Sequence, residues 1–374
     1  MKTLDSLLEN AAARLEALGL ALASVVTGFD GFVDEMISVV AERKSLEHFE
    51  TVPDIATFGA LVSAAAGQSS LREILIHAVH PGGCAVNLGD GLAALGVPVD
   101  CFATLGEPVN PAFAETTARF RSTHSWGREP GRTLAFEFSD GKLMFSSVRQ
   151  LAEFTADAVR ERLTDKTYLA ACRDAPVIAL TDWSLYPHMT GVWRLLQEAV
   201  YARLKHCPHF FLDLVDPSTR SPADILAMVK TLPGFELRGA VTLGLNGNEA
   251  YVLARLLGLP EAKNEMNNCQ RLADDLHRHL GISTVVIHQT HFAVAASPDG
   301  SAMVPGPHCA QPLKSTGAGD RFNAGYCLGL LARGTLEDCL VLGCASSGFF
   351  VRKARSADRA ELAAFLQHWK ANLL

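Results

Sequence analysis

Residues 315–325 read Ser-Thr-Gly-Ala-Gly-Asp-Arg-Phe-Asn-Ala-Gly, so that three small residues precede a single carboxylate, Asp320. The apolar run that follows is typical of a helix. Small residues let a backbone approach a ligand closely, and the unpaired N–H groups of a helix N-terminus attract anions such as phosphate. Asp320 would accept a proton from a hydroxyl group while these amides hold a phosphoryl group, which is what phosphoryl transfer to an alcohol requires. By itself, the stretch is equally a glycine-rich turn with Asp320 as the helix cap.

The composition of the chain favours a large folded domain and excludes several functions. Its 374 residues are 48% hydrophobic, which is enough for one large α/β domain or two smaller ones. The net charge is −7 without a Lys/Arg cluster, so we expect no nucleic-acid partner. Charged residues interrupt every apolar run before about 18 residues, so we expect no membrane span. Nine cysteines without a C-x-x-C pair predict free thiols and a cytoplasmic location.

Apolar runs alternate with helical segments through most of the chain, which predicts a doubly wound, mostly parallel sheet flanked by helices. The expected strands are 23–27, 99–103, 177–180, 210–214, 240–243 and 284–288, with an antiparallel edge strand at 291–296. The expected helices are an amphipathic N-terminal segment and residues 54–66, 86–95, 320–334, 337–353 and 358–370.

A small β lid is expected beside this sheet. The turn Asp140-Gly141 lies between two β-prone runs and predicts a hairpin. We therefore predict a single α/β domain over residues 1–374, with a lid built from roughly 33–45, 99–106 and 131–150. Residues 41–80 have no assigned role at this stage.

Polar side chains that could do chemistry follow directly after several of the expected strands. Ligands of open α/β sheets bind beyond the carboxyl ends of the strands, so these residues are expected to share one site. They are Asp30, Asp34, Asp213, Asp216, Asn246 and Glu249.

From about Gly28 to Ala357, the chain resembles the ribokinase-like (PfkB) carbohydrate kinases. Residues 316–322, Thr-Gly-Ala-Gly-Asp-Arg-Phe, are similar to the C-terminal signature of that family. The resemblance implies that Asp320 is the catalytic base. It also implies that the amides of Gly317, Ala318 and Gly319 form an anion hole for the transferred phosphate, next to Thr316.

A second motif resembles the N-terminal signature of the same family. Residues 82–87 read Gly-Gly-Cys-Ala-Val-Asn, and the resemblance implies that this turn, with Gly82, Gly83 and Asn87, contacts the hydroxyl groups of a sugar. In the family an earlier aspartate binds two neighbouring hydroxyls, as a carboxylate can by accepting two hydrogen bonds. Asp34 is the better match and Asp30 the alternative, and either could instead be a turn or cap residue.

Residues 246–249, Asn-Gly-Asn-Glu, resemble the motif with which the family organises Mg²⁺ near the phosphates of ATP. The resemblance implies that Asn246 and Glu249 act on the metal largely through water, consistent with the preference of Mg²⁺ for oxygen ligands. The same four residues also fit a helix cap with a glutamate three positions on.

Among the places where the chain departs from the family, two bear on how the nucleotide phosphates are held. The family usually has an aspartate six residues before the base, where it helps to hold a monovalent cation, and this chain has Lys314. We hypothesise that the ammonium group of Lys314 replaces that cation; a solvated surface lysine is the alternative. His288-Gln289-Thr290-His291 replaces a glycine-containing loop, which places His288 close to the nucleotide but changes how the phosphates are held.

The function that the resemblance implies is ATP- and Mg²⁺-dependent phosphorylation of a primary hydroxyl group of a sugar or sugar-like molecule. Alternatives are a non-catalytic sugar- or nucleotide-sensing protein on the same fold, and a nucleoside kinase or ADP-dependent sugar kinase. A Rossmann-type dehydrogenase is disfavoured, because the first expected strand does not lead into a G-x-G-x-x-G turn. The lid could be a flap or the interface of a homodimer.

Overall fold

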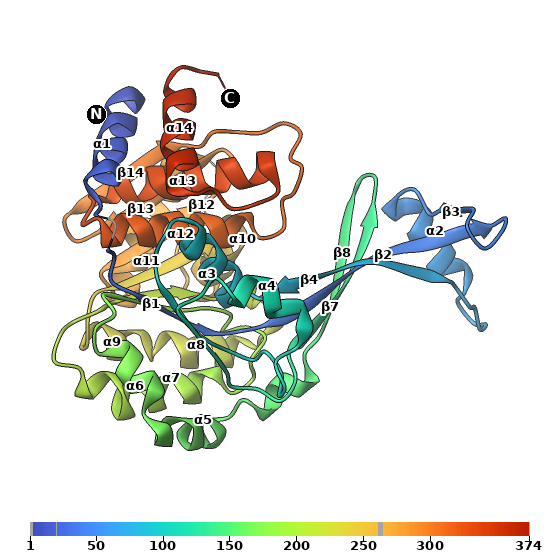
Figure 1. Ribbon diagram of the computed structural model, residues 1–374, viewed down its shortest axis with the longest axis horizontal. Helices are drawn as coiled ribbons and strands as arrows, with labels where there is room; N and C mark the ends of the chain where they lie inside the picture. Colours follow the sequence, from blue (N-terminus) through green and yellow to red (C-terminus); the bar gives the residue numbers. More distant parts are fainter. Residues whose placement is uncertain (1–2, 20, 261–264, 374) are drawn as a thin grey trace.

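The computed structural model describes residues 3–19, 21–260 and 265–373. Its main element is a nine-stranded sheet with the order β14-β13-β12-β11-β10-β9-β1-β5-β6 (Figure 1). The strands from β12 to β6 are parallel, and β13 and β14 add antiparallel pairs at one end. Their bounds are β1 Val25–Phe29, β5 Val99–Ala103, β6 Ser122–Ser125, β9 Val177–Leu180, β10 His209–Asp213, β11 Val241–Asn246, β12 Thr284–His288, β13 Phe292–Ser297 and β14 Gly300–Pro305.

Helices cover both faces of this sheet, because its central strands are apolar on both sides and must be buried on both. One face packs against α5 Ala156–Arg162, α6 Thr167–Cys172, α7 Met189–Ala199, α8 Pro222–Val229, α9 Leu232–Glu236, α10 Gly247–Leu256 and α11 Met266–Leu280. The other face packs against α1 Leu4–Ala17, α3 Cys84–Ala94, α12 Ala318–Leu331, α13 Leu336–Lys353 and α14 Arg359–Lys370. The short helix α4 is Ala114–Thr117, and 3₁₀ turns occupy 111–113, 149–153, 163–165, 201–203 and 217–219.

A separate small sheet projects from this body as an arm (Figure 1). The central strand β2 pairs with β3 and β4 in antiparallel fashion and with β7 in parallel fashion, and β7 pairs with β8 in a hairpin. The bounds are β2 Phe32–Arg43, β3 Phe49–Thr51, β4 Ile74–Gly82, β7 Gly131–Phe138 and β8 Gly141–Ser147, with α2 Ile55–Ala64 at the far end. Segment 41–80, which had no assigned role, thus supplies part of the arm.

Two sequence-based expectations need correction. Residues 99–106 were expected in the lid, but β5 pairs with β1 and β6 inside the large sheet. All five residues of β5 are buried, as a strand covered on both faces requires. The predicted antiparallel strand at 291–296 is present as β13, but it is not the edge, because β14 pairs with its outer side.

The parallel strands end on the side of the sheet where α3, α10 and α12 begin, as the ribokinase-like expectation requires. The N-terminal signature lies at the junction of β4 and α3, and the C-terminal signature opens α12. None of the helices in the described part of the chain is long and apolar enough to span a membrane.

Candidate active site

The turn before α12 presents a glycine-rich backbone at the centre of the molecule. Gly317 is the N-cap of α12 and has a φ of +87°, a left-handed conformation that favours glycine. A β-carbon there would lie 2.9 Å from the guanidinium nitrogen Nη1 of Arg321. The amide of Ala318 donates to the carbonyl of Ser315 over 3.0 Å. One of the three amides predicted to hold a phosphoryl group is therefore bonded within the turn itself.

Asp320 lies in the first turn of α12 with only 8% of its surface exposed. The side-chain amide of Asn87, on α3, donates to its Oδ2 over 3.0 Å. Burial raises the pKa of Asp320 to about 7; the positive charge of Arg321 opposes this shift and the negative charges of Asp213 and Asp30 add to it. A carboxyl group that titrates near neutral pH is suited to accept a proton from a hydroxyl group.

The two carboxylates predicted as alternatives for sugar binding have different surroundings. Asp30 is buried, and it accepts hydrogen bonds from the Thr181 hydroxyl at 2.6 Å and from the backbone N–H groups of Cys84 and Ala85 at the start of α3. Asp34, on β2, lines a cavity. Asp30 therefore holds the start of α3 in place, and Asp34 is the carboxylate that a ligand in this cavity can reach.

Gly82 and Gly83 connect β4 to α3 where the backbone passes very close to both aspartates. A β-carbon at Gly82 would lie 2.4 Å from the Asp34 carboxylate. At Gly83, where φ is +95°, it would lie 2.8 Å from the carbonyl oxygen of Asp30. Both positions therefore need glycine, and this close approach brings Asn87 to the same site.

A cavity of about 340 Å³, here called the acceptor-side cavity, lies between the small sheet and the start of α12. Its walls combine apolar side chains with nine polar or charged residues, which can offer hydrogen bonds to the hydroxyl groups of a ligand. Within its wall, Glu137 is paired with both Lys142 and His77, so part of the charge is compensated. Its main polar residues are Asp34, His80, Asn87, Lys142, Lys314 and Arg321.

A second cavity, of about 250 Å³ and here called the donor-side cavity, lies between the 288–290 loop, the 306–312 segment and α13. The ring of His288 lies against that of Phe322, with ring centres 4.8 Å apart. Burial lowers the pKa of His288 to about 4, so this side chain is neutral at pH 7.

The two cavities adjoin the same turn. Thr316 lines the acceptor-side cavity, whereas Ser315, Ala318 and Gly319 line the donor-side cavity. Asp320 follows directly in the chain. A group held by the amides of this turn would therefore lie next to both cavities and next to the carboxylate.

Asn246 and Glu249 form a capping box at the start of α10. Oδ1 of Asn246 accepts from the backbone N–H of Glu249 over 3.0 Å, while Glu249 accepts from the backbone N–H and the side-chain amide of Asn246 over 2.8 and 2.7 Å. Burial raises the pKa of Glu249 to about 8, and the negative charge of Asp213 adds to the shift. The structure thus contains the cap that the sequence allowed as an alternative to a metal role.

Several buried carboxylates gather around this end of the sheet. Burial raises the pKa of each of them, and mutual repulsion adds to the shift of several, as Asp30 does for Asp182. Asp182 was not among the predicted site residues, although it stands just after β9 and that position was a usable signal. The set is Asp30, Asp182, Asp213, Glu249 and Asp320.

A divalent cation near these carboxyl groups would offset their negative charge when they are ionised. Within the described ranges, no group of three or more His, Cys, Asp or Glu side chains is arranged to bind a metal directly. Mg²⁺ commonly keeps several waters and uses only one or two carboxylates together with phosphate oxygens. A water-mediated Mg²⁺ site at Glu249 and Asn246 is therefore consistent with these residues.

Lys314 lies half-buried in the wall of the acceptor-side cavity. Its ammonium nitrogen is 5.7 Å from the centre of the Phe350 ring. Burial lowers the pKa of Lys314, and the positive charge of Arg321 lowers it further, whereas Asp34 raises it. Lys314 is thus part of the site, not a lysine free in solvent.

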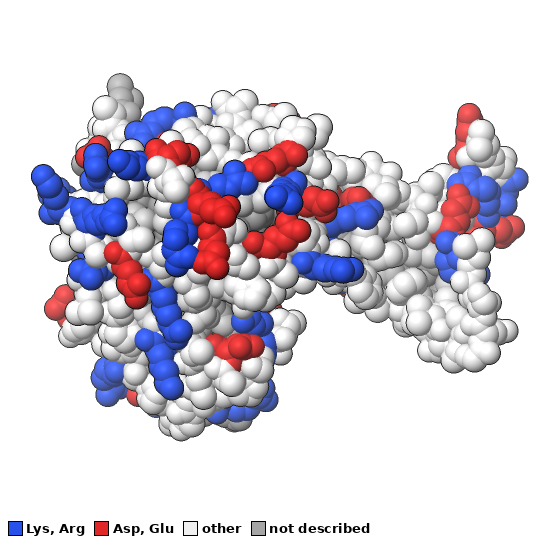
Figure 2. Space-filling model, turned by 90° about the horizontal axis from the view of Figure 1, so that it is seen from below, with Lys and Arg blue, Asp and Glu red and all other residues white. Residues whose placement is uncertain are grey.

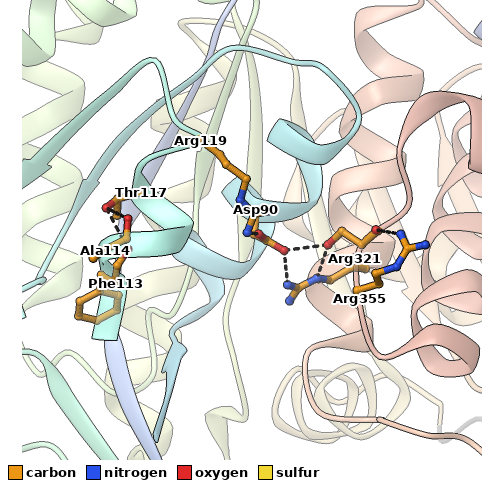
Figure 3. A network of polar contacts seen from close by, with 8 residues as sticks. Asp90, Phe113, Ala114, Thr117, Arg119, Arg321 and Arg355 are labelled. Atoms are coloured by element: carbon orange, nitrogen blue, oxygen red, sulfur yellow. Dashed lines mark hydrogen bonds and ion pairs between the residues drawn. The ribbon is translucent and has the colours of Figure 1, made fainter. Parts of the chain in front are cut away.

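The signature motif contains Arg321 but assigns it no role, and Asp90 belongs to none of the motifs in the sequence. Nη2 of Arg321 donates to Oδ2 of Asp90 over 2.6 Å, and Arg119 pairs with the other oxygen of that carboxylate (Figure 3). No sequence pattern indicated the Arg321–Asp90 pair, because the two residues are 231 positions apart and meet only where α12 packs on α3.

The chain is similar to known proteins over most of its length. Residues 8–369 match a family model described as prokaryotic ketohexokinase. The chain is 30% identical over 344 residues to a ketohexokinase of Haloferax volcanii, covering 91% of this chain and 90% of that protein. Among solved structures, a ribokinase of Thermotoga maritima is similar with a TM-score of 0.60, at 16% identity and over 93% of this chain and 100% of the other. An E. coli protein described as a ribokinase II, in complex with ATP and Mg²⁺, is similar with a TM-score of 0.59, also at 16% identity and with the same coverage.

Proposed function

We propose a specific reaction for this chain, which belongs to the prokaryotic ketohexokinase family and is a carbohydrate kinase with a ribokinase-like fold. The reaction is transfer of the γ-phosphoryl group of ATP to a primary hydroxyl group of a ketohexose. The observation that carries the proposal is the position of residues 315–320. Their turn adjoins one cavity suited to a polyol and a second on its other flank, and it ends in a buried carboxylate.

In this proposal Asp320 accepts the proton of the attacking hydroxyl group. Because its pKa is about 7, a substantial fraction of this carboxyl group is ionised at neutral pH, and the carboxylate is basic enough to take the proton. The amides of the turn, at Gly317, Ala318 and Gly319, stabilise the charge on the transferred group. The Ala318 amide would exchange its bond to Ser315 for one to the phosphoryl oxygen.

The sugar would lie in the acceptor-side cavity. Asp34 accepts hydrogen bonds from two neighbouring hydroxyl groups, and Asn87 contacts the sugar while it holds Asp320. Gly82 and Gly83 leave room for this arrangement, because any side chain at either position would collide with Asp34 or the backbone at Asp30.

The nucleotide would lie in the donor-side cavity, with its phosphates towards the turn. His288 is neutral there, so it can position a phosphate or ribose oxygen by a hydrogen bond but contributes no charge. Mg²⁺, held through water by Glu249 and Asn246, would supply neutralisation of the phosphate oxygens. We also place the enzyme in the cytoplasm, since all nine cysteines are free thiols, as in a reducing compartment.

The domain organisation that we propose is one α/β domain whose small sheet closes over the acceptor-side cavity. The strands that contribute cavity residues are β2, β4, β7 and β8. Closure of such a lid would exclude water and limit wasteful hydrolysis of ATP.

The arm also fits the interface of a homodimer. Its exposed apolar side chains include Val62 on α2, Ile74, Ile76 and Val79 on β4, and Met144 and Phe145 on β8. Figure 2 shows a long uncharged stretch of the arm between its base and a charged cluster at its end. Exposed apolar surface of this kind marks an interaction site, and a second copy of the chain is the partner that we propose. A monomer in light scattering at micromolar concentration would contradict it.

The decisive experiment measures ADP release from Mg-ATP across ketohexoses, aldoses, their monophosphates and nucleosides. The Asp320→Asn variant serves as control. We expect turnover with a ketohexose that is lost in the variant. Turnover only with nucleosides, or only with ADP as donor, would replace the proposed acceptor or donor. Binding of sugar and nucleotide by a folded protein without any turnover would favour a sensor.

A further inference from the structure

Arg321 is a buried arginine whose three guanidinium nitrogens have different surroundings. Nη2 donates to Asp90 over 2.6 Å, and Nε donates to the hydroxyl of Ser356 over 3.2 Å. The same hydroxyl donates to Asp90 over 2.8 Å, which closes a ring of contacts among Arg321, Ser356 and Asp90. The guanidinium carbon Cζ lies over the Phe350 ring, 4.6 Å from its centre. The position of the positive charge is therefore held from three sides.

The remaining nitrogen, Nη1, has no hydrogen-bond partner among the residues that the structure describes, and it points to the reaction centre. It lies 2.9 Å from the β-carbon position of Gly317, and Oδ2 of Asp320 lies 3.8 Å from that same position. Arg321 also lines the acceptor-side cavity. Nη1 and the carboxylate thus both lie within 4 Å of the same point beside Gly317.

The other ionisable groups around Asp320 are acidic, and each adds negative charge when it is ionised. The ionisable groups that act on it from other elements are Asp30 before β2, Cys84 on α3, Asp213 at the end of β10, Asp182 after β9 and Glu249 on α10. Among the largest influences on Asp320, Arg321 supplies the positive one. Transfer of a phosphoryl group, which is itself anionic, would add to this excess of negative charge.

We propose that Arg321 is a fixed positive charge of the catalytic centre: anchored by Asp90 and Ser356, it directs Nη1 to the Gly317 turn, where it offsets the charge of Asp320 and of the transferring phosphoryl group. Asp90 is then a positioning residue for Arg321. It lies one helical turn after Asn87, so α3 holds the base and the cation with two side chains of the same face. The role in phosphoryl transfer rests on the proposed kinase function; the effect on Asp320 does not.

The test compares Arg321→Met with Arg119→Met. Both variants remove a cation that is paired with Asp90, but Arg119 is half-exposed and makes its contact on the outer side of that carboxylate. We expect Arg321→Met to lower kcat by roughly 10²-fold or more, with a small change in the KM of the sugar. Arg119→Met should keep nearly wild-type kinetics, and Arg321→Lys should regain part of the loss. Equal losses in the two Met variants would overturn the proposal.

A second variant addresses a purely structural role. Asp90→Asn combined with Arg321→Met removes both charges of the buried pair, so that no carboxylate is left without a partner. We expect it to recover thermal stability but not kcat. Recovery of kcat would show that Arg321 only compensates Asp90, and the proposal would fall.

A third readout does not depend on sugar turnover. The carboxyl carbon of Asp320 can be followed by ¹³C NMR as a function of pH, with Asp320→Asn used to assign its signal. We expect Arg321→Met to move this titration to higher pH, because an attractive charge is lost, and Arg321→Lys to leave it near the wild-type value. An unchanged titration in Arg321→Met would refute the electrostatic role even if the kinase function were wrong.

Discussion

The side-chain amide of Asn87 donates a hydrogen bond of 3.0 Å to Oδ2 of Asp320, although 233 positions separate the two residues in the chain. This bond connects the turn of the N-terminal signature to the helix of the C-terminal one. Because Asn87 also lines the acceptor-side cavity, a sugar bound there would lie within reach of the carboxylate.

Asp320→Asn should lower kcat by roughly 10²–10⁴-fold, the usual contribution of a general base. Asparagine has nearly the same shape and can still accept a hydrogen bond from Asn87, so the affinity for the sugar should survive. Steady-state kinetics and calorimetric titration with the sugar check both statements. Near-normal turnover would remove Asp320 from the role of base.

Activity should fall as the pH decreases through about 7, because Asp320 must be ionised to accept a proton and its pKa is raised to about 7. Below that value kcat/KM should decrease about tenfold per pH unit. A pH profile of kcat/KM at saturating Mg-ATP tests this. An acid limb with its midpoint near pH 4 would contradict the assignment.

The same raised pKa predicts an effect on stability. Folded Asp320 holds its proton up to about pH 7, whereas the unfolded group releases it near 3.8. The free energy of unfolding therefore decreases as the pH rises from about 3.8 to about 7. Asp320→Asn removes this pH dependence. The variant should therefore have a higher free energy of unfolding than the wild type at pH 8, and the two proteins should become equal in stability below pH 4. Denaturant titrations at the two pH values check the sign.

Asp34→Asn and Asp30→Asn should have different consequences. Asp34 lines the cavity, so its loss should raise the KM of the sugar by roughly 10- to 100-fold with little change in melting temperature. Asp30 accepts two hydrogen bonds from the start of α3 and one from the Thr181 hydroxyl, so its replacement should lower the free energy of unfolding by about 1–3 kcal/mol. Thermal unfolding and sugar titration of both variants decide the matter. A stable Asp30→Asn protein with lost sugar affinity would reverse the two roles.

The catalytic rate should be nearly indifferent to replacement of K⁺ by Na⁺ at equal ionic strength, if the ammonium group of Lys314 takes the place of a monovalent cation. Lys314→Met should then be slower and should respond to K⁺. Strong activation of the wild-type enzyme by K⁺ would exclude this role for Lys314.

Glu249→Gln should raise the Mg²⁺ concentration that gives half-maximal activity, because one negative charge near the metal is lost. The KM of the sugar should change little. Glu161→Gln, at an exposed position on α5, is the matched control. Equal Mg²⁺ dependence in both variants would remove Glu249 from the metal site.

Local patterns determined much of this protein. The alternation of apolar runs predicted the parallel strands, and the small residues of 315–319 predicted a turn at a helix start, because both depend on neighbours in the chain. Both Asp30 and Asp34 follow the first strand, and the sequence favoured Asp34 only through the family resemblance. It also placed 99–106 in the lid, because a short apolar strand does not reveal its partner.

Contacts between residues that are far apart in the chain decided the remaining features of the site. That Asp30 caps α3, that β5 lies inside the large sheet, and that Asp90 holds Arg321 all depend on which elements meet in space. The raised pKa of Asp320 likewise comes from burial among carboxylates of other elements. The sequence by itself determined which groups are present and which local turns carry them. Only the tertiary structure decided which charges face each other, because that energy depends on distance and on exclusion of water.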